Sequence, residues 1–123
     1  MRVILDTNGL MTQAQFGLDI FEELGALGYD ECVVPSAVKE ELATLRKKVR
    51  GEDKIALAIA EKLADRCEVV DTPRAGAVDD IVLATAKDLK APVFTNDAAL
   101  RSRLKKAGVR TIFLRSRQKL AIE

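Results

Sequence analysis

The chain opens with MRVILDTN (residues 1–8), in which an apolar run ends abruptly in Asp6, Thr7 and Asn8. Residues 3–5 are typical of a buried strand. Asp and Asn often start turns, so a strand followed by a turn is the simplest interpretation. A carboxylate that leaves a central strand must nevertheless find a partner or a cation, because burying an unpaired charge costs free energy. Asp6 is therefore the first candidate site residue.

The length and composition are those of one globular domain, which we expect to span residues 1–123. Apolar residues make up 48% of the chain and charged residues 32%, as in ordinary globular proteins. No apolar run is as long as a membrane span and no leader-like segment precedes the first strand, so we expect a cytoplasmic protein without membrane contact. The chain has no histidine, which excludes Ser-His-Asp and Cys-His catalysis and histidine metal sites.

The two cysteines, Cys32 and Cys67, each stand near the start of a predicted strand. They lack C-x-x-C spacing, which argues against a zinc site. Thiols favour strand interiors, so we expect both cysteines to be free and buried. The alternative is a disulfide between neighbouring strands, as occurs in proteins of hyperthermophiles.

Short apolar strands alternate with helical patterns along the chain. The predicted strands are residues 2–6, 31–35, 67–71, 92–95 and 111–115. Apolar residues at helical spacing predict helices over residues 16–27, 36–45, 55–63, 78–89 and 97–107. Phe16 and Ile55 are expected to face inward, and Ser36 to cap its helix. This alternation predicts an α/β fold in which helices cover both faces of a mostly parallel sheet.

Acidic residues follow the predicted strands at the edge where open α/β sheets bind ligands. Besides Asp6, they are Glu40, Glu41, Asp79, Asp80 and Asp97. Each has a structural alternative. Asp97 could simply be the cap of its helix, and Asp79 and Asp80 could simply interact favourably with a helix dipole. A pair of glutamates such as Glu40 and Glu41 is usually solvated.

Carboxylates that converge without a basic partner repel each other unless a cation lies among them. Oxygen ligands of this kind suit Mg²⁺ or Mn²⁺. Such an ion lowers the pKa of a bound water and stabilises the attacking and leaving oxygens of a phosphodiester. Metal-dependent hydrolysis is therefore a reaction that a chain without histidine can support.

Four segments, in order along nearly the whole chain, resemble the motifs of PIN-domain ribonucleases. They are ILDTN (4–8), PSAVKEELATL (35–45), VDDIVLATA (78–86) and VFTNDAALRSRLKKAGV (93–109). The resemblance implies a three-layer α/β/α sandwich with a parallel five-stranded sheet in the order 3-2-1-4-5. It also selects Glu41 over Glu40, because the motif places Leu directly after its Glu. Asp79 is selected over Asp80 by its distance of seven residues from Ala86.

The resemblance implies Mg²⁺- or Mn²⁺-dependent cleavage of single-stranded RNA by water. It implies that Asp6, Asp79 and Asp97 hold the metal, and that Glu41 completes the catalytic site or orients water. Supporting roles are implied for Asn8, Thr95, Glu40 and Asp80. Two branches of the family are open: VapC toxins, whose partner is an antitoxin protein, and the rRNA-processing endonuclease of the small-subunit processome, toward which the third and fourth motifs lean. A homodimer is the habit of the family.

Basic residues gather in the last quarter of the chain, as expected for phosphate contacts. The candidates for RNA binding are Arg101, Arg103, Lys105, Arg115 and Arg117. Two other classes remain open. One is a PIN-like module that binds RNA or protein without catalysis. The other is a phosphorylation receiver domain, which fits less well because the first strand ends in a single acid and Arg115 stands where a Lys is expected.

Overall fold

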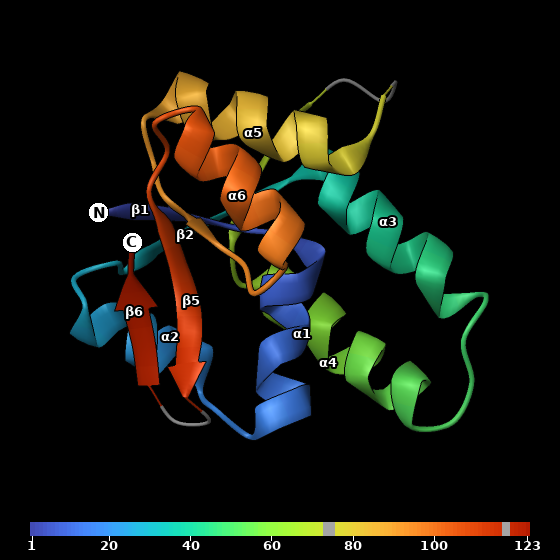
Figure 1. The fold of residues 1–123 in the computed structure, drawn as a ribbon. Helices are drawn as coiled ribbons and strands as arrows, with labels where there is room; N and C mark the ends of the chain where they lie inside the picture. The colour runs from blue at the N-terminus through green and yellow to red at the C-terminus, as the bar shows by residue number, and fades with distance from the viewer. Residues whose placement is uncertain (73–75, 117–118) are drawn as a thin grey trace.

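The computed structural model describes residues 1–72, 76–116 and 119–123, and six strands in these residues form one sheet (Figure 1). The strands are β1 (Arg2–Leu5), β2 (Glu31–Pro35), β3 (Glu68–Val70), β4 (Val93–Phe94), β5 (Thr111–Ser116) and β6 (Lys119–Ile122). Their order is β3-β2-β1-β4-β5-β6. β1 pairs in parallel with both β2 and β4. The chain therefore adds strands first on one side of β1 and then on the other, so the strand order reverses at β1.

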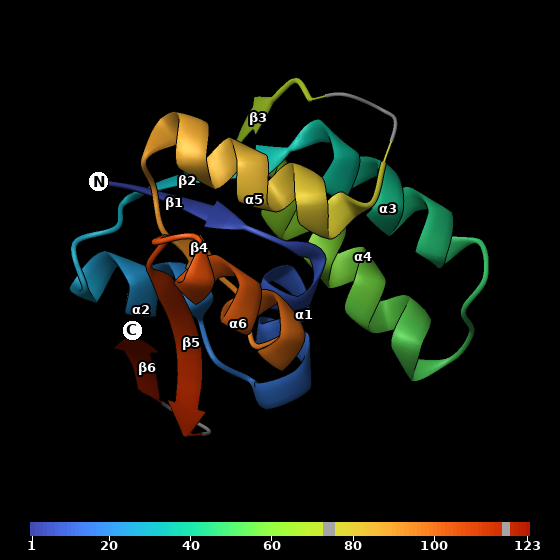
Figure 2. The ribbon, with the colours of Figure 1, turned by 45° about the horizontal axis from the view of Figure 1, so that its top comes forward.

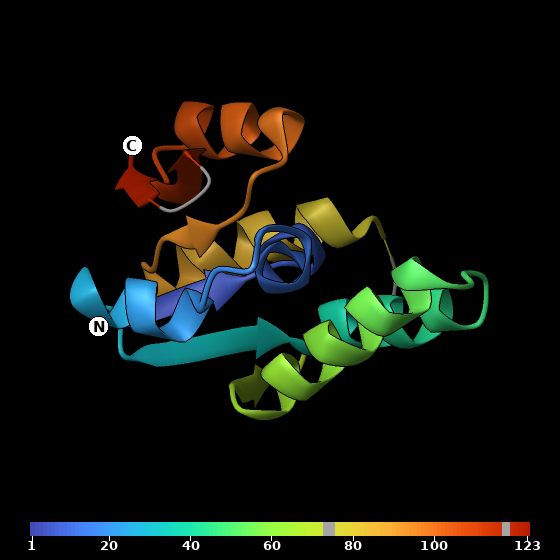
Figure 3. The ribbon, with the colours of Figure 1, turned by 90° about the horizontal axis from the view of Figure 1, so that it is seen from below.

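The described helices form a layer on each face of this sheet. They are α1 (Thr7–Phe16), α2 (Ile20–Ala26), α3 (Ser36–Arg46), α4 (Glu52–Asp65), α5 (Val78–Leu89) and α6 (Ala98–Lys106). α5 and α6 lie on one face and α1, α2 and α4 on the other, while α3 extends beyond the ends of the strands (Figures 1 and 3). None of the helices in the described ranges is both long and apolar enough to cross a membrane.

The predicted fold class and the order of the first five strands are confirmed, but the sheet has a sixth strand. β6 pairs antiparallel with β5, with Leu114 opposite Leu120 and an irregularity between Leu114 and Ser116. An antiparallel return needs only a short connection, whereas each parallel strand needs a crossover. β6 is four residues long and half exposed at the sheet edge, so its apolar pattern is too weak to predict it.

The core lies on both faces of the central strands. Residues 3–5 of β1 are completely buried, as are Val33 and Val34 of β2 and both residues of β4. Burial on both faces accounts for the continuous apolar runs that predicted these strands. The rigid centre of the sheet therefore ends directly at Asp6.

The helix predicted over residues 16–27 begins too early: the helix there is α2, and α1, which ends at Phe16, was not predicted. Gly17 ends α1 in the left-handed conformation (φ 66°), and the Asp19 side chain accepts a hydrogen bond from the Glu22 amide at the start of α2. Phe16 is consequently 46% exposed. On α4, Ile55 was also expected to face inward but is 65% exposed.

The prediction that Ser36 caps the helix after β2 is wrong. Ser36 is the first residue of α3, and Pro35 precedes it without a side-chain cap. Its hydroxyl lies 3.0 Å from that of Thr72 and accepts a hydrogen bond from the Thr72 amide at 2.9 Å. Ser36 thus joins the start of α3 to the segment after β3.

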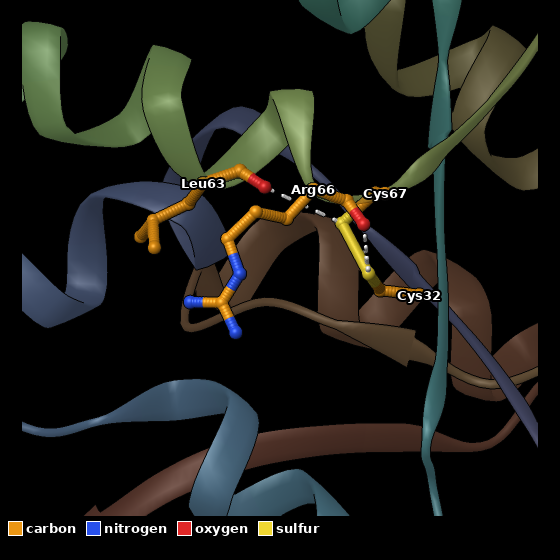
Figure 4. The surroundings of a disulfide bond; sticks show 4 residues. All are labelled: Cys32, Leu63, Arg66 and Cys67. Carbon is orange, nitrogen blue, oxygen red and sulfur yellow. Dashed lines mark hydrogen bonds between the residues drawn. A yellow bond between two sulfur atoms is a disulfide. The ribbon is translucent and has the colours of Figure 1, made fainter.

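The two cysteines form a disulfide, so the expectation of free thiols is wrong. Cys32 of β2 and Cys67, just before β3, have Cα atoms 4.9 Å apart (Figure 4). Their sulfur atoms also lie near backbone carbonyl oxygens, those of Arg66 (3.7 Å) and Leu63 (3.6 Å). Neighbouring parallel strands bring the two residues together, which is the alternative that their positions allowed. The bond lies at the amino ends of these strands.

Candidate active site

Asp6 joins the end of β1 to the start of α1. Its carboxylate caps the helix by accepting a hydrogen bond from the Gly9 amide at 2.6 Å. Gly9 is required by close packing, because a Cβ at this position would lie 2.3 Å from the carbonyl oxygen of Phe94 in β4. The tight approach of α1 to β4 holds Asp6 between the two central strands.

Burial raises the pKa of the Asp6 carboxyl to about 7, from an ordinary value near 3.8. The carboxyl is 5% exposed, so its charged form loses hydration. Hydrogen bonds from the Gly9 amide and the Thr95 side chain lower its pKa, and the negative charges of Asp79 and Asp97 raise it. The balance shows a buried acid that faces two other acids.

A cleft of about 350 Å³ lies at this end of the sheet. Figure 2 shows the starts of α1, α3, α5 and α6 gathered beyond the carboxyl ends of the central strands. The cleft is lined by Asp6, Thr7, Asn8, Met11, Gln15, Glu41, Val78, Asp79 and Asp97. The four acids selected by the motifs therefore line one cleft, together with Asn8. Glu40, Asp80 and Thr95 are not part of this lining.

Glu41 comes to the cleft from α3 and is bound there by Thr7. The Thr7 hydroxyl, on the first residue of α1, donates a hydrogen bond to Oε1 of Glu41. Thr7 was not singled out from the sequence, although it belongs to the DTN motif. The neighbouring Glu40 is exposed and lines a hollow between α3 and α5 that Glu41 also lines. Of the two glutamates, only Glu41 lines the cleft.

The doubled aspartates at the start of α5 also separate. Asp79 lines the cleft, and its pKa is raised by partial burial and by the charge of Asp97. Asp80 is exposed and accepts a hydrogen bond from Arg103 of α6 at 2.5 Å. The Arg103 charge also lowers the pKa of Asp79, so a cation lies at the margin of the cleft.

Asp97 is the N-cap of α6. Its Oδ1 accepts hydrogen bonds from the amides of Ala99 (2.9 Å) and Leu100 (3.2 Å). The Asp97 amide donates to the hydroxyl of the completely buried Thr95 at 3.1 Å. Since Thr95 also bonds to Asp6, it lies between the two acids rather than in the cleft. The structural alternative for Asp97, helix capping, is real, and the same side chain also lines the cleft.

The predicted RNA-binding residues differ in their exposure and in their contacts. Arg101 packs over the ring of Phe113, 3.6 Å from its centroid, and pairs with Glu123 at 2.7 Å. Lys105, one turn further along α6, lies 3.7 Å from the same carboxylate. Arg115 is exposed on β5. Arg117 lies outside the described residues.

The donor set of the cleft fits a hard divalent cation in its chemistry. Among the described residues, its lining offers carboxylate, hydroxyl and amide oxygens and includes no Lys or Arg. Burial raises the pKa of both Asp6 and Asp79, and neighbouring negative charges raise it further, as expected where a cation is needed to balance charge. In the described part of the chain, however, no three acidic or cysteine side chains are close enough together to hold an ion as they stand.

The fold and the cleft define a three-layer α/β protein with an acidic site at the point where strand order reverses, the usual ligand position in such sheets. Over residues 3–117 the chain matches the PIN-like domain family. It therefore belongs to that family, as its four motifs predicted.

The chain is also similar to named proteins and solved structures. The chain is 29% identical over 120 residues to ribonuclease VapC9 of Archaeoglobus fulgidus, covering 98% of this chain and 87% of that protein. Among solved structures, the PIN domain endonuclease Utp24 is similar with a TM-score of 0.79 and 28% identity, covering 99% of this chain and 90% of that one. A domain of a functionally unknown protein from Methanocaldococcus jannaschii matches with a TM-score of 0.68, 19% identity and 94% and 91% coverage, and shows the fold alone.

Proposed function

We propose that this protein is a divalent-metal-dependent endoribonuclease that hydrolyses single-stranded RNA. The observation that carries the proposal is the cleft to which β1, α3, α5 and the α6 cap contribute Asp6, Glu41, Asp79 and Asp97. The names of two relatives, ribonuclease VapC9 and endonuclease Utp24, support the same activity. The contacts of each of these residues support the role that we assign to it.

In this proposal Asp6, Asp79 and Asp97 hold Mg²⁺ or Mn²⁺. A bound ion supplies Lewis-acid chemistry: it lowers the pKa of water and neutralises charge on the phosphodiester. The positive charge of a bound ion would balance the negative charges that, after burial, raise the pKa of Asp6 and Asp79. The two helix-cap bonds to Asp97 engage only Oδ1, so we assign Oδ2 of this residue to the ion.

Glu41 is assigned to orient the attacking water and accept its proton. The Thr7 hydroxyl occupies Oε1 of Glu41 and holds the carboxylate at the cleft. Oε2 is then the atom that accepts the proton. A base held by a neighbouring hydroxyl contributes through its orientation as much as through its basicity.

The RNA backbone is assigned to the side of the cleft formed by α6. Arg103 lies at the margin beside Asp79 and Asp80. Arg101 and Lys105 follow on the same helix, whose cap is Asp97. Cations beside an acidic metal site can contact the phosphates that flank the scissile bond. Arg115 extends this basic side along β5.

The test uses the purified chain and a labelled, unstructured RNA with Mn²⁺ or Mg²⁺. We expect cleavage that stops in excess EDTA. We expect Glu41→Gln and Asp79→Asn to lose more than the roughly 10- to 100-fold typical of outer-shell groups. The matched neighbours, Glu40→Gln and Asp80→Asn, should lose little. Undiminished cleavage in EDTA would refute metal dependence. RNA binding without any cleavage would support the non-catalytic module instead.

The biological setting is either that of a toxin or that of rRNA processing. The toxin setting includes an antitoxin protein as partner, and in both settings we propose a homodimer. A short antitoxin gene beside this one would support the toxin setting. Light scattering on the purified chain would test the dimer, and a monomer at all concentrations would contradict it.

A further inference from the structure

Asn96 lies in the turn between β4 and α6, between the buried Thr95 and the acid Asp97. Each of its polar groups other than the backbone carbonyl has a partner outside the turn. The backbone amide donates to Oδ1 of Asn8 at 2.8 Å. The side-chain Nδ2 donates to Oγ1 of Thr12 at 3.0 Å, and Oδ1 accepts from the Leu114 amide at 2.6 Å. Asn96 thus joins two elements: α1, at its start and in its second turn, and β5.

These contacts close into a ring between the two turns that carry acids. The hydroxyl of Thr12, which is completely buried, accepts from Asn96 and donates to the backbone oxygen of Asn8 at 3.2 Å. Asn8 is therefore joined to Asn96 by two routes, one direct and one through Thr12. The buried Thr12 hydroxyl is satisfied both as donor and as acceptor, and a satisfied network of this kind holds a single geometry.

The residues on either side of Asn96 bear directly on the acids. Thr95 bonds to the carboxylate of Asp6 and accepts from the amide of Asp97. The ring fixes the middle of the turn against α1, two residues beyond Asp6. Asn96 and Thr95 therefore both hold the turn that carries Asp97 against the start of α1, beside Asp6.

Only a carboxamide of this length satisfies the site. Leu114 offers a backbone donor and needs an acceptor, while the Thr12 hydroxyl has donated its proton to Asn8 and needs a donor. A carboxylate at position 96 would supply no donor, and a hydroxyl would be too short to reach both elements.

We propose that Asn96 is a positioning residue that, through Thr12 and Asn8, holds Asp97 in place relative to Asp6 and thereby supports the binding of a divalent cation. The inference rests on the proposed function. It assigns to Asn96, and to the hydroxyl of Thr12, part of the metal affinity of the cleft although neither contacts the ion. It also links β5, which carries Arg115, to the geometry of the acids.

The test measures Mn²⁺ binding to the full-length, metal-free chain by calorimetry, independently of RNA cleavage. We expect Asn96→Ala to weaken Mn²⁺ binding about 10-fold, as substitution of outer-shell partners does in metal sites. Thr12→Val keeps the branched shape and removes the hydroxyl, so it should weaken binding several-fold. Thr12→Ser keeps the hydroxyl and should bind Mn²⁺ nearly as the unaltered chain does.

Leu104→Ala separates positioning from simple loss of stability. Leu104 is completely buried on α6 and takes no part in the ring, so its truncation lowers the Tm by leaving a cavity. We expect its Mn²⁺ affinity to be unchanged. If it falls as far as that of Asn96→Ala, or if Asn96→Ala binds Mn²⁺ normally, the inference is overturned.

Two further outcomes are decisive. If Asn96→Ala does not fold, the comparison of Thr12→Val with Thr12→Ser decides, and equal Mn²⁺ affinities in that pair overturn the inference. If the unaltered chain binds no Mn²⁺, the proposed function itself fails and the inference fails with it. Weak binding confined to the ring variants would support both.

Discussion

Replacing Asp6 with Asn should make the metal-free protein more stable while abolishing its cleavage of RNA. The substitution keeps the shape of the side chain and the oxygen that accepts from the Gly9 amide. It removes a carboxyl that is 5% exposed and faces the charges of Asp79 and Asp97. If the charged form of Asp6 stabilised the fold, the same substitution would instead lower the stability of the protein.

The size of the effect follows from the shifted pKa. In the folded chain the pKa of Asp6 is about 7, against 3.8 for an ordinary Asp. The folded state therefore binds the proton more tightly than the unfolded state, so this group lowers stability progressively as pH rises from about 4 to about 7. The full penalty above pH 7 is about 4 kcal/mol, at about 1.4 kcal/mol per pKa unit.

The expected gain in the variant is somewhat smaller than this penalty. The new amide nitrogen meets the Thr95 hydroxyl, which already accepts from the Asp97 amide and donates to Asp6. An imperfect hydrogen bond there costs about 1 kcal/mol. A net gain of about 3 kcal/mol at pH 8 would raise the Tm by roughly 10 °C. At pH 4 the gain should vanish, because Asp6 is then protonated.

Calorimetry of the EDTA-treated proteins between pH 4 and pH 8 measures this difference. Asp19→Asn is the matched control, since Asp19 also caps a helix by accepting from a backbone amide, but it is exposed and outside the cleft. The control should show no gain that grows with pH. A lower Tm for Asp6→Asn at pH 8 would refute the reasoning and make the charged form of Asp6 structural.

Three other predictions concern packing, the disulfide and the metal. Gly9→Ala places a Cβ 2.3 Å from the Phe94 carbonyl oxygen and should lower the free energy of unfolding in urea by about 3 kcal/mol. Gly25→Ala in α2, whose Cβ meets nothing within 4 Å, should leave that free energy unchanged or raise it. Equal effects of the two substitutions would contradict the packing argument. The denatured, unreduced chain should show no thiol to Ellman's reagent, and a reactive thiol would contradict the pairing. Reduction of Cys32–Cys67, which are 35 residues apart, should lower the free energy of unfolding by about 4 kcal/mol. It should not alter cleavage, because the disulfide lies at the amino ends of the strands and the cleft at their carboxyl ends. Saturating Mn²⁺ should remove the loss of stability between pH 4 and pH 7, and an unchanged pH profile would argue against an ion among the acids.

Much of the fold was predictable because its signals are local. The continuous apolar strands and the intervening helices follow from burial on both faces of a parallel sheet. The boundary between α1 and α2 was also encoded, by Gly17, which ends the first helix, and Asp19, which caps the second. That signal was outweighed by apolar residues whose helical spacing continues across it.

Other features depended on partners far along the chain. β6 forms because β5 extends past β4 and leaves an edge for it to pair with. Cys32 and Cys67 could pair only once β2 and β3 were neighbours. Ser36 bonds to Thr72, 36 residues away, rather than to its own helix. No local pattern reports contacts of this kind.

The sequence by itself determined the chemistry available to this protein: acids after strands, no histidine, and motifs that place it in its family. Tertiary structure decided which acids meet. Glu41 and Asp79 turn into the cleft while Glu40 and Asp80 turn away, because side chains one position apart on a helix point about 100° apart. Tertiary structure also decided the proton affinity of Asp6. This residue is buried between β1 and α1, and it faces Asp79 and Asp97 only because the starts of α5 and α6 come to the same place.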